Sequence, residues 1–379
     1  MSQIKKTIMI ILFYLLRIFP IDNKKIVVCS YLGKGYGDNG KYIVNELLRR
    51  NLGFDIVWLV RNKDEEFPSG VRSVKYNTLR AVYEQVTAKL WIDNRRKPGY
   101  VRKRSKQIYI MTWHAGIGLK RGEGAAVNAL ANYYVSAAKN DSKMADLFLS
   151  NSTWTTDMYR KYFWYNGKIL EKGLPREDIL FQPQTDLKKK LAKVYGLESN
   201  SNIILYAPTF RKSMSVEELA LYNLEWSILL NMLNKKTQGN WVGMIRLHPN
   251  ISDQSALLHL PLNVIDTSLY PDMQELLAIS DILITDYSSC MFDFGATGKP
   301  VFIYAPDLQE YKNDRNFFFN LEELPFVISE SQESLRNSIS NFDESTYKNK
   351  VEKFYDKCGL FKGGEASKYV VDYIIEHMS

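Results

Sequence analysis

Short apolar runs alternate with longer helix-like stretches along almost the whole chain, and this alternation restricts the fold more than any other feature. A buried apolar run followed by a helix-like segment is typical of βαβ units and therefore of parallel sheets. In the first half, strand-like runs occupy residues 25–30, 55–60, 89–93 and 109–114, and a helix is expected near 41–50. These runs predict an α/β fold.

The same pattern starts again after a polar stretch at 182–190, which we interpret as a linker. The repetition predicts two open parallel-sheet domains that face each other across a cleft, with ligands at the carboxyl ends of the strands. The second set of strand-like runs is 203–207, 241–247, 263–266, 281–286 and 300–304, with helices expected at 216–234, 344–355 and 366–377.

These patterns predict four segments. They are an N-terminal apolar helix at 1–22, a first Rossmann-like domain at 23–187, a second at 188–360, and a C-terminal helix at 361–379 that packs back on the first domain.

The N-terminal segment is apolar from Ile8 to Leu16, after Lys5 and Lys6, and it is interrupted by Arg17. It is shorter than the roughly 20 residues that a membrane-spanning helix needs. We interpret it as an interfacial anchor helix on a membrane surface. A core helix and a cleaved signal peptide are the alternatives, although no small-residue cleavage site follows.

Charge and cysteine content limit the function classes. The chain has 50 lysines and arginines against 42 acidic residues, a net charge of +8, which favours polyanionic partners such as phosphorylated substrates, anionic lipid or nucleic acid. Its three cysteines, Cys29, Cys290 and Cys358, form no CxxC pair. This excludes a disulfide scaffold and a zinc knuckle, and fits a reducing compartment.

A glycine-rich turn follows the first strand-like run and resembles a P-loop. The position that would bind Mg²⁺ is Tyr42, so we do not favour an NTPase. A turn of this kind at a helix N-terminus can line a phosphate or acceptor site, and the alternative is a plain tight turn. The chain has no D-x-D pair, so the sequence implies neither a metal nor a cofactor.

The sharpest local feature is Thr112-Trp113-His114, at the end of a strand-like run and followed by small residues that include Gly116. Glycines let a ligand approach the backbone closely. A neutral imidazole can accept a proton from a hydroxyl group near neutral pH. We predict that His114 is a general base, and the alternative is a buried histidine bonded to a carbonyl.

Cationic and hydroxyl side chains gather at the strand ends of the second half. Arg211 follows one strand, and Arg246 and His248 end another and are expected to share one side. A guanidinium group fits phosphate oxygens, and ion pairing within the domain is the alternative. Ser288 and Ser289 occupy the start of a helix, where we expect N-capping and attraction of an anion.

A dense basic cluster covers residues 95–97, 102–104 and 106. It could be a solvated loop or a nucleic-acid surface, but no RNA-binding aromatic motif accompanies it. With the apolar N-terminal segment, contact with anionic lipid or a lipid-linked diphosphate is the interpretation we favour.

Taken together, these motifs resemble the CDP-glycerol glycerophosphotransferase family, the teichoic acid primases and polymerases. The matching stretches are DNGKY at 38–42, TWH at 112–114, GLPREDIL at 173–180, APTFR at 207–211, RLHP at 246–249, TDYSS at 285–289, FD at 292–293 and KP at 299–300. One departure is the segment after His114, which reads AGIG where many polymerases read GTP.

The resemblance implies a GT-B fold and a peripheral enzyme on the cytoplasmic face of a bacterial membrane. It implies transfer of glycerol phosphate from CDP-glycerol to an undecaprenyl-diphosphate-linked or other polyanionic glycan, with CDP-ribitol and nucleotide-sugar donors as alternatives and no nucleic acid as partner. His114 matches the base, with Arg211 and His248 as further catalytic residues. The expected donor-binding residues are Arg211, Arg246, His248, Thr285, Asp286, Ser288 and Ser289, and the expected acceptor-binding residues are Gly35, Asp38, Asn39, Trp113, Gly116 and Lys120.

Overall fold

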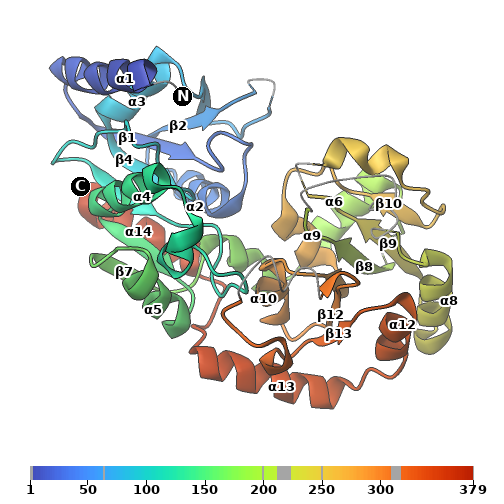
Figure 1. Ribbon diagram of the computed structural model, residues 1–379. Coiled ribbons are helices and arrows are strands. Elements are labelled where there is room, and N and C mark those ends of the chain that lie inside the picture. The colour runs from blue at the N-terminus through green and yellow to red at the C-terminus, as the bar shows by residue number, and fades with distance from the viewer. Residues whose placement is uncertain are drawn as a thin grey trace. The chain divides into compact units, whose positions relative to one another are not determined.

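The structure is a computed structural model that describes residues 3–62, 65–198, 200–210, 223–248, 251–308 and 317–378. The chain forms two compact units (Figure 1). Unit 1 comprises Met1–Gly116, Gly122–Asp178 and Gly359–Ser379, and unit 2 comprises Ile117–Arg121 and Ile179–Cys358.

Unit 1 is built on a seven-stranded parallel sheet with the strand order β3-β2-β1-β4-β5-β6-β7. The strands are β1 (Asp22–Cys29), β2 (Asp55–Val60), β3 (Val71–Lys75), β4 (Ala88–Asp93), β5 (Ile108–Met111), β6 (Leu147–Ser150) and β7 (Lys168–Glu171). The helices are α1 (Gln3–Leu15), η1 (Leu16–Ile18), α2 (Asp38–Arg49), α3 (Leu79–Thr87), η2 (Glu123–Ala129), α4 (Asn132–Met144), α5 (Thr153–Tyr162) and α14 (Ala366–Met378).

Alternating side chains of β1 and β2 divide between the two faces of this sheet, as strand geometry requires. Ile26 and Val28 pack with α2 and α14 on one face, whereas Val27 and Cys29 pack with α1, α3 and α5 on the other. Because both faces are covered by helices, the central strands are apolar throughout, and this explains the unbroken apolar runs in the sequence.

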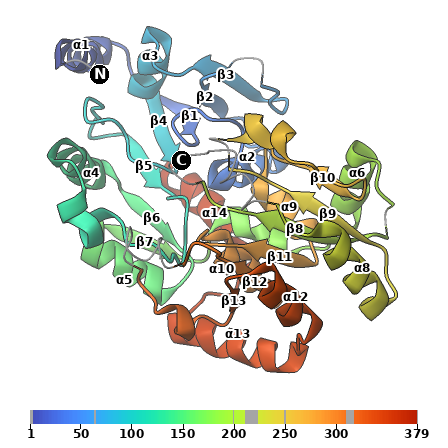
Figure 2. The ribbon, with the colours of Figure 1, turned by 45° about the vertical axis from the view of Figure 1, so that its right-hand side comes forward.

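Helix α1 packs beside α3 (Figures 1 and 2). One apolar side of α1 is buried and the other is exposed. Phe13 is fully buried, and Met9 packs against the same cluster. The exposed apolar residues along this segment are Ile4, Ile8, Ile11, Tyr14, Leu15, Ile18 and Phe19. No helix in the described part of the chain has the length and apolar character needed to cross a bilayer.

Unit 2 contains a six-stranded parallel sheet with the order β10-β9-β8-β11-β12-β13. The strands are β8 (Asn202–Ala207), β9 (Trp241–Ile245), β10 (Val264–Asp266), β11 (Ile282–Thr285), β12 (Val301–Tyr304) and β13 (Val327–Ser329). The helices are η3 (Pro175–Phe181, which begins in unit 1), α6 (Thr185–Tyr195), α8 (Trp226–Thr237), η4 (Ser252–Leu257), α9 (Met273–Ile279), α10 (Cys290–Gly295), η5 (Leu321–Glu323), α12 (Gln332–Ser340) and α13 (Glu344–Cys358).

Both sheets have the doubly wound order in which the chain reverses direction beside the first strand. The reversal lies between β1 and β4 in unit 1, and between β8 and β11 in unit 2. The prediction of two Rossmann-like parallel-sheet domains is therefore confirmed. In folds of this kind, the crevice at the carboxyl ends of these strand pairs is where ligands bind.

Two local expectations need correction. The run 109–114 is not a strand throughout, because β5 ends at Met111 and Trp113 has a positive φ of 54°. The stretch 182–190 is not an extended linker, since α6 begins at Thr185. Helix α6 is amphipathic and buries Leu191 and Ala192.

Candidate active site

His114 lies just beyond the carboxyl end of β5, and its ring is held by the residue that follows β4. The Nδ1 atom of His114 is 2.9 Å from the carbonyl oxygen of Asn94. A carbonyl only accepts, so Nδ1 carries the hydrogen and Nε2 carries the lone pair. Among the residues that the structure describes, none forms a hydrogen bond with Nε2, which is therefore the atom that can accept a proton.

The main chain around His114 is held by two side chains from other elements. Asn39, at the start of α2, donates its Nδ2 hydrogen to the carbonyl oxygen of Trp113 at 2.9 Å. Arg176, in η3, donates from Nη1 to the carbonyl oxygen of His114 at 2.6 Å. The backbone N–H of Arg176 in turn donates to Oδ1 of Asn39 at 3.1 Å. These bonds bring together residues from three distant parts of the sequence.

Asp38 completes this group with its carboxylate. Its Oδ2 accepts a hydrogen bond from the Tyr31 hydroxyl at 2.7 Å and lies 3.3 Å from Nη1 of Arg176. Tyr31, Asp38 and Trp113 all have positive φ angles, of 46°, 57° and 54°. Residues other than glycine rarely adopt a positive φ. Those that do often lie at functional sites, where contacts with the surroundings hold the backbone in this conformation.

The imidazole is kept neutral by its surroundings. Burial lowers the pKa of His114 to about 4, and the positive charges of Arg95 and Arg176 act in the same direction. The hydrogen bond to Asn94 and the negative charge of Asp38 oppose this shift of the pKa without cancelling it. At neutral pH the ring is therefore uncharged and its Nε2 lone pair is available.

The glycines near His114 have local structural reasons for being glycine. A Cβ atom on Gly116 would lie 2.1 Å from Nδ2 of Asn151, so close packing against that side chain excludes any larger residue. Gly35 has a φ of +84°, in the region that favours glycine. Lys120 belongs to unit 2, where it pairs with Phe317, so it is not part of the His114 group.

In unit 2, the strand pair at the reversal point is joined by Asp286 and Thr209. The Asp286 carboxylate accepts from the backbone N–H of Thr209 at 2.9 Å and from the Thr209 hydroxyl at 2.9 Å. It also accepts from the backbone N–H of Tyr287 at 2.6 Å. The buried Thr285 hydroxyl donates to the carbonyl oxygen of Ala207 at 2.6 Å. Asp286 and Thr285 thus fix the ends of β8 and β11.

The cationic residues predicted for the donor side have different settings. Arg246 is largely buried and donates to the carbonyl oxygen of Tyr270, and burial lowers its pKa. His248 is exposed, with its ring 6.0 Å from that of Phe210. Since β9 ends at Ile245, strand alternation does not decide how these two residues point. The predicted site residue Arg211 lies outside the described residues.

The serines at the start of α10 differ from a standard cap. Ser289 occupies the N-cap position but its side chain forms no capping hydrogen bond. Ser288 Oγ instead accepts from the backbone N–H of Cys290 at 3.4 Å. Capping by Ser288 is thus present and capping by Ser289 is not. Both serines are partly exposed at the carboxyl end of β11.

The prediction of an exposed basic cluster is wrong for two of its residues, Arg96 and Lys97. Arg96 is buried and pairs with Glu123 at 2.9 Å and Asp141 at 3.3 Å. Lys97 is buried and pairs with Asp93 at 2.6 Å. Sequence composition alone does not reveal acidic partners 27 and 45 residues away. The other basic residues of this loop remain at least partly exposed, among them Arg95, Lys103 and Lys106.

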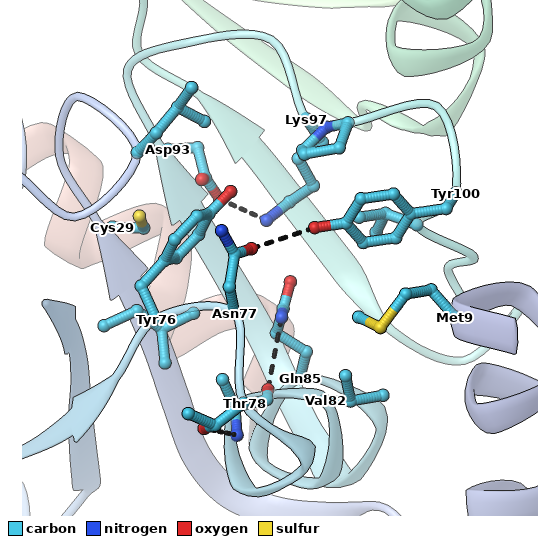
Figure 3. Close-up of a pocket in the computed structure, with 15 residues that line it drawn as sticks. Met9, Cys29, Tyr76, Asn77, Thr78, Val82, Gln85, Asp93, Lys97 and Tyr100 are labelled. Carbon is cyan, nitrogen blue, oxygen red and sulfur yellow. Dashed lines mark hydrogen bonds and ion pairs between the residues drawn. The ribbon is translucent and has the colours of Figure 1, made fainter. Parts of the chain in front are cut away.

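A small internal cavity lies beside this second ion pair, under α1 and α3 (Figure 3). Its volume is about 10 Å³, roughly the room of one water molecule. Asp93, Lys97, Cys29 and Met9 line it, and burial raises the pKa of the Cys29 thiol. The cavity is too small for a substrate. The Asp93–Lys97 ion pair beside it joins the last residue of β4 to the segment that follows Asn94.

The residues that hold His114 were only partly found from the sequence. Arg176 lies in the stretch 173–180 that carries the family resemblance, but its local sequence predicts no role for it, and Asn94 and Tyr31 belong to no motif. The one indication of a role for Asn94 and Tyr31 is their position: Asn94 follows β4 and Tyr31 follows β1, and the strand order reverses between these two strands. Among the described residues, no three His, Cys, Asp or Glu side chains gather in a way that could hold a metal ion.

The chain is similar to known proteins over almost its whole length. The sequence model for the family "CDP-Glycerol:Poly(glycerophosphate) glycerophosphotransferase" matches residues 11–376. A teichoic acid poly(glycerol phosphate) polymerase of Staphylococcus epidermidis is 33% identical over 93% of this chain. A protein of the same description from Bacillus spizizenii is 28% identical over 96% of this chain. The chain spans 51% of the first relative's length and 95% of the second's.

Solved structures give the same result. A structure of a variant of the wall teichoic acid polymerase TagF, soaked with CDPG, has a TM-score of 0.86 and 30% sequence identity. The match covers 98% of this chain and 94% of that one. Another TagF structure has a TM-score of 0.84 and covers 100% of this chain and 99% of that one.

Proposed function

This chain belongs to the CDP-glycerol:poly(glycerophosphate) glycerophosphotransferase family, and from that membership we propose that it transfers glycerol phosphate from CDP-glycerol to a hydroxyl group of an acceptor, releasing CMP. One observation about the chain itself carries the proposal. A neutral histidine, His114, presents an unprotonated Nε2 at the carboxyl ends of the unit 1 strands. A group of this kind can remove a proton from an attacking hydroxyl.

In the proposed reaction, the acceptor oxygen attacks the phosphorus that bears glycerol. A new phosphorus–oxygen bond forms and the bond to the CMP phosphate oxygen breaks. The acceptor proton moves to Nε2 of His114, and CMP departs with the bonding electron pair as an anion. Transfer of this type needs mainly alignment and neutralisation of charge.

The donor side of the proposed site is the carboxyl edge of the unit 2 sheet. We assign contacts with the diphosphate to Arg211, Arg246 and His248, since cationic side chains neutralise phosphate oxygens. Ser288 and Ser289 offer hydroxyl groups after β11. Thr285 and Asp286 act by fixing the strand ends rather than by touching the donor, because their side chains are buried and already bonded.

The acceptor side of the proposed site is the group around His114. We assign it the glycine-rich turn with Gly35, Asp38 and Asn39, together with Trp113 and Gly116. Lys120, which we expected on the acceptor side, belongs to unit 2 and is not included. The proposed acceptor is a glycan carried on undecaprenyl diphosphate, or another polyanionic glycan of a cell-wall or capsular polymer. The segment after His114 differs from that of many polymerases, and we propose that it sets which acceptor is used.

A donor panel tests the activity. Purified protein is incubated with lipid-linked disaccharide and with CDP-glycerol, CDP-ribitol, or UDP- and GDP-sugars, and products are analysed by mass spectrometry. The proposal expects CMP release and a mass gain of one glycerol phosphate unit with CDP-glycerol. CMP release with CDP-ribitol alone would indicate a ribitol phosphotransferase, and UDP or GDP release would indicate a glycosyltransferase. No turnover of any donor, with salt-sensitive binding to RNA, would instead support a nucleic-acid-binding protein.

We also propose that the enzyme works as a peripheral protein at the cytoplasmic face of the bacterial membrane. The exposed apolar side of α1 supports this, with Ile8 51% and Ile11 49% exposed. Basic residues lie next to the end of this helix, because Arg104 donates to the carbonyl oxygen of Phe19 and Arg17 donates to that of Lys103. Apolar insertion together with basic residues is a combination that binds anionic bilayers.

The double substitution Ile8→Ser and Ile11→Ser is expected to weaken binding to phosphatidylglycerol vesicles by about tenfold or more, because two partly exposed isoleucines lose their transfer into lipid. Cosedimentation measures this, with phosphatidylcholine vesicles for comparison. Leu262→Ser, at an exposed apolar residue of unit 2, is the matched control and should leave binding unchanged. Equal binding by all three proteins would contradict membrane docking through α1.

A further inference from the structure

The backbone at Trp113 and His114 accepts side-chain hydrogen bonds at two consecutive carbonyl oxygens. Asn39 binds the carbonyl of Trp113, and Arg176 binds the carbonyl of His114. Asn39 and Arg176 are also bonded to each other through the Arg176 backbone N–H. The two residues thus form one clamp, built from the start of α2 and from η3, around a single turn of chain.

The backbone conformation at Trp113 is unfavourable by itself and needs contacts from other elements to stabilise it. Trp113 is a bulky residue with a φ of 54°, and such residues persist in the left-handed region only when neighbouring contacts fix them. Within the described part of the chain, the His114 ring has one hydrogen bond, to the carbonyl oxygen of Asn94. The direction of Nε2 therefore depends on the position of the main chain at residues 113 and 114, which the clamp sets.

Arg176 is suited to this task by burial and charge. Its guanidinium group is 5% exposed and its Nη1 atom is shared between the His114 carbonyl and the Asp38 carboxylate. Asp38 is held in turn by the Tyr31 hydroxyl. The charged groups that act on the imidazole are Asp38, Arg95 and Arg176, with the rings of Tyr31 and Trp113 packed beside it. Arg176 is thus the only one of these cations that also bonds the peptide of His114.

We propose that Arg176 is a positioning residue for glycerol phosphate transfer, which aims the Nε2 atom of His114 through the His114 carbonyl and holds the turn at Trp113. It need not touch either substrate. The inference rests on the proposed function in so far as His114 acts as the base, but the hold on the imidazole is a property of the chain that can be measured without turnover.

The kinetic test uses Arg176→Met and Arg176→Lys in the full chain. A displacement of about 1 Å in a catalytic group can cost about 10²-fold in rate. Arg176→Met is therefore expected to lower kcat by about 10–100-fold, with KM for CDP-glycerol changed less than about threefold. Arg176→Lys keeps the charge and one donor, so it should recover part of the loss. The matched control is Arg50→Met, because Arg50 also bonds a carboxylate and a carbonyl in unit 1.

The second readout is independent of activity. The chain has four histidines, so nitrogen NMR of labelled protein can be assigned by comparison with His114→Gln. Wild type should show one tautomer, with hydrogen on Nδ1. Arg176→Met should show mixed tautomers and a higher pKa for His114, since a nearby cation has been removed while Asp38 remains. Arg50→Met should match wild type.

The possible outcomes separate the two claims. Absence of CMP release by wild type would refute the proposed function. The NMR spectra of the His114 imidazole would still test whether Arg176 positions the ring. Unchanged spectra and unchanged kcat in both Arg176 variants would overturn the positioning role. If Arg176→Met does not fold, Arg176→Lys carries the same test, with an expected loss of about tenfold in kcat and a detectable change in the tautomer signal.

Discussion

Replacing His114 by alanine is expected to slow transfer from CDP-glycerol by about 10²–10⁴-fold, the usual contribution of a general base. The physical reason is the lone pair on Nε2, which exists because Nδ1 donates its hydrogen to the Asn94 carbonyl. Alanine removes this proton acceptor and should leave the binding of CDP-glycerol that we propose for unit 2 unaffected. Measurement of CMP release by purified protein at saturating donor tests the expectation.

The dependence on pH gives a sharper form of the same prediction. Burial lowers the pKa of His114 to about 4, so the base is active above that pH and is lost when the ring is protonated below it. The plot of kcat/KM for wild type should therefore be flat from pH 8 to about 5. The acid limb of kcat should lie at higher pH than that of kcat/KM, because a bound diphosphate anion favours the protonated ring.

Two further sets of variants test whether His114 acts as the base. His248→Ala and Arg211→Ala would each remove one of the proposed contacts with the diphosphate. A charge-assisted contact contributes roughly 1.5–3 kcal/mol, so about a tenfold to hundredfold loss in transfer rate is expected for each variant. His114→Gln should be as slow as His114→Ala, since an amide keeps a polar side chain but cannot serve as a base. Near-normal transfer by either His114 variant would refute the base assignment.

The general architecture could be predicted because buried parallel strands leave a clear trace in the sequence. Val27 and Trp58 lie in strands covered on both faces, and such strands read as unbroken apolar runs. The strands that escaped notice are at or near the edges of the sheets. In β3 (Val71–Lys75), only Val74 is buried, and β13 (Val327–Ser329) has three residues, so neither produces an apolar run.

The candidate site could be predicted only for residues that carry their own signal. His114, Trp113, Asp38 and Asn39 belong to conspicuous motifs, and the structure brings these four together. Arg176 escaped because its role depends on contacts with residues 62 and 138 positions away. Long-range pairing of this kind is set by the order of strands in the sheet, which the local sequence does not reveal.

The basic loop shows the opposite error, in which a local signal was misleading. Arg96 and Lys97 read as solvated charges, yet both are buried against carboxylates. Net charge counts residues but not their burial, and a buried ion pair contributes nothing to attraction of an outside polyanion. Membrane contact as proposed here therefore depends on Arg95, Arg104 and Lys106 rather than on the whole cluster, since Lys103 is paired with Asp146.

Lys97→Met is expected to lower the free energy of unfolding of unit 1 by about 3–5 kcal/mol near pH 8, the usual cost of removing one partner from a buried ion pair. The Nζ atom of Lys97 is 2.6 Å from Oδ2 of Asp93, and the two side chains are 3% and 5% exposed (Figure 3). Methionine fills the space of the lysine stem but leaves Asp93 as an uncompensated buried charge. Scanning calorimetry of the purified chain measures the change.

The loss of unfolding free energy caused by Lys97→Met should be larger at high pH than at low pH. Burial already raises the pKa of Asp93 from 3.8 to about 6, with Lys97 acting against the rise. A carboxyl group whose folded pKa is raised adds stability below its unfolded pKa, and this stability is lost as pH rises through the folded pKa. Wild type loses it between about pH 4 and just above pH 6. Without Lys97 the folded pKa rises further, so the loss continues to higher pH.

The difference between Lys97→Met and wild type should therefore be small at pH 5 and largest near pH 8. Adding Asp93→Asn to Lys97→Met removes the unpaired charge and should restore most of the stability at pH 8. Lys368→Met is the matched control, because Lys368 pairs with Glu365 across exposed side chains at 3.5 Å in the same unit, and exposed pairs contribute little. A Lys97→Met destabilisation that is the same at pH 5 and pH 8 would show that lost packing, and not the buried charge of Asp93, is its cause.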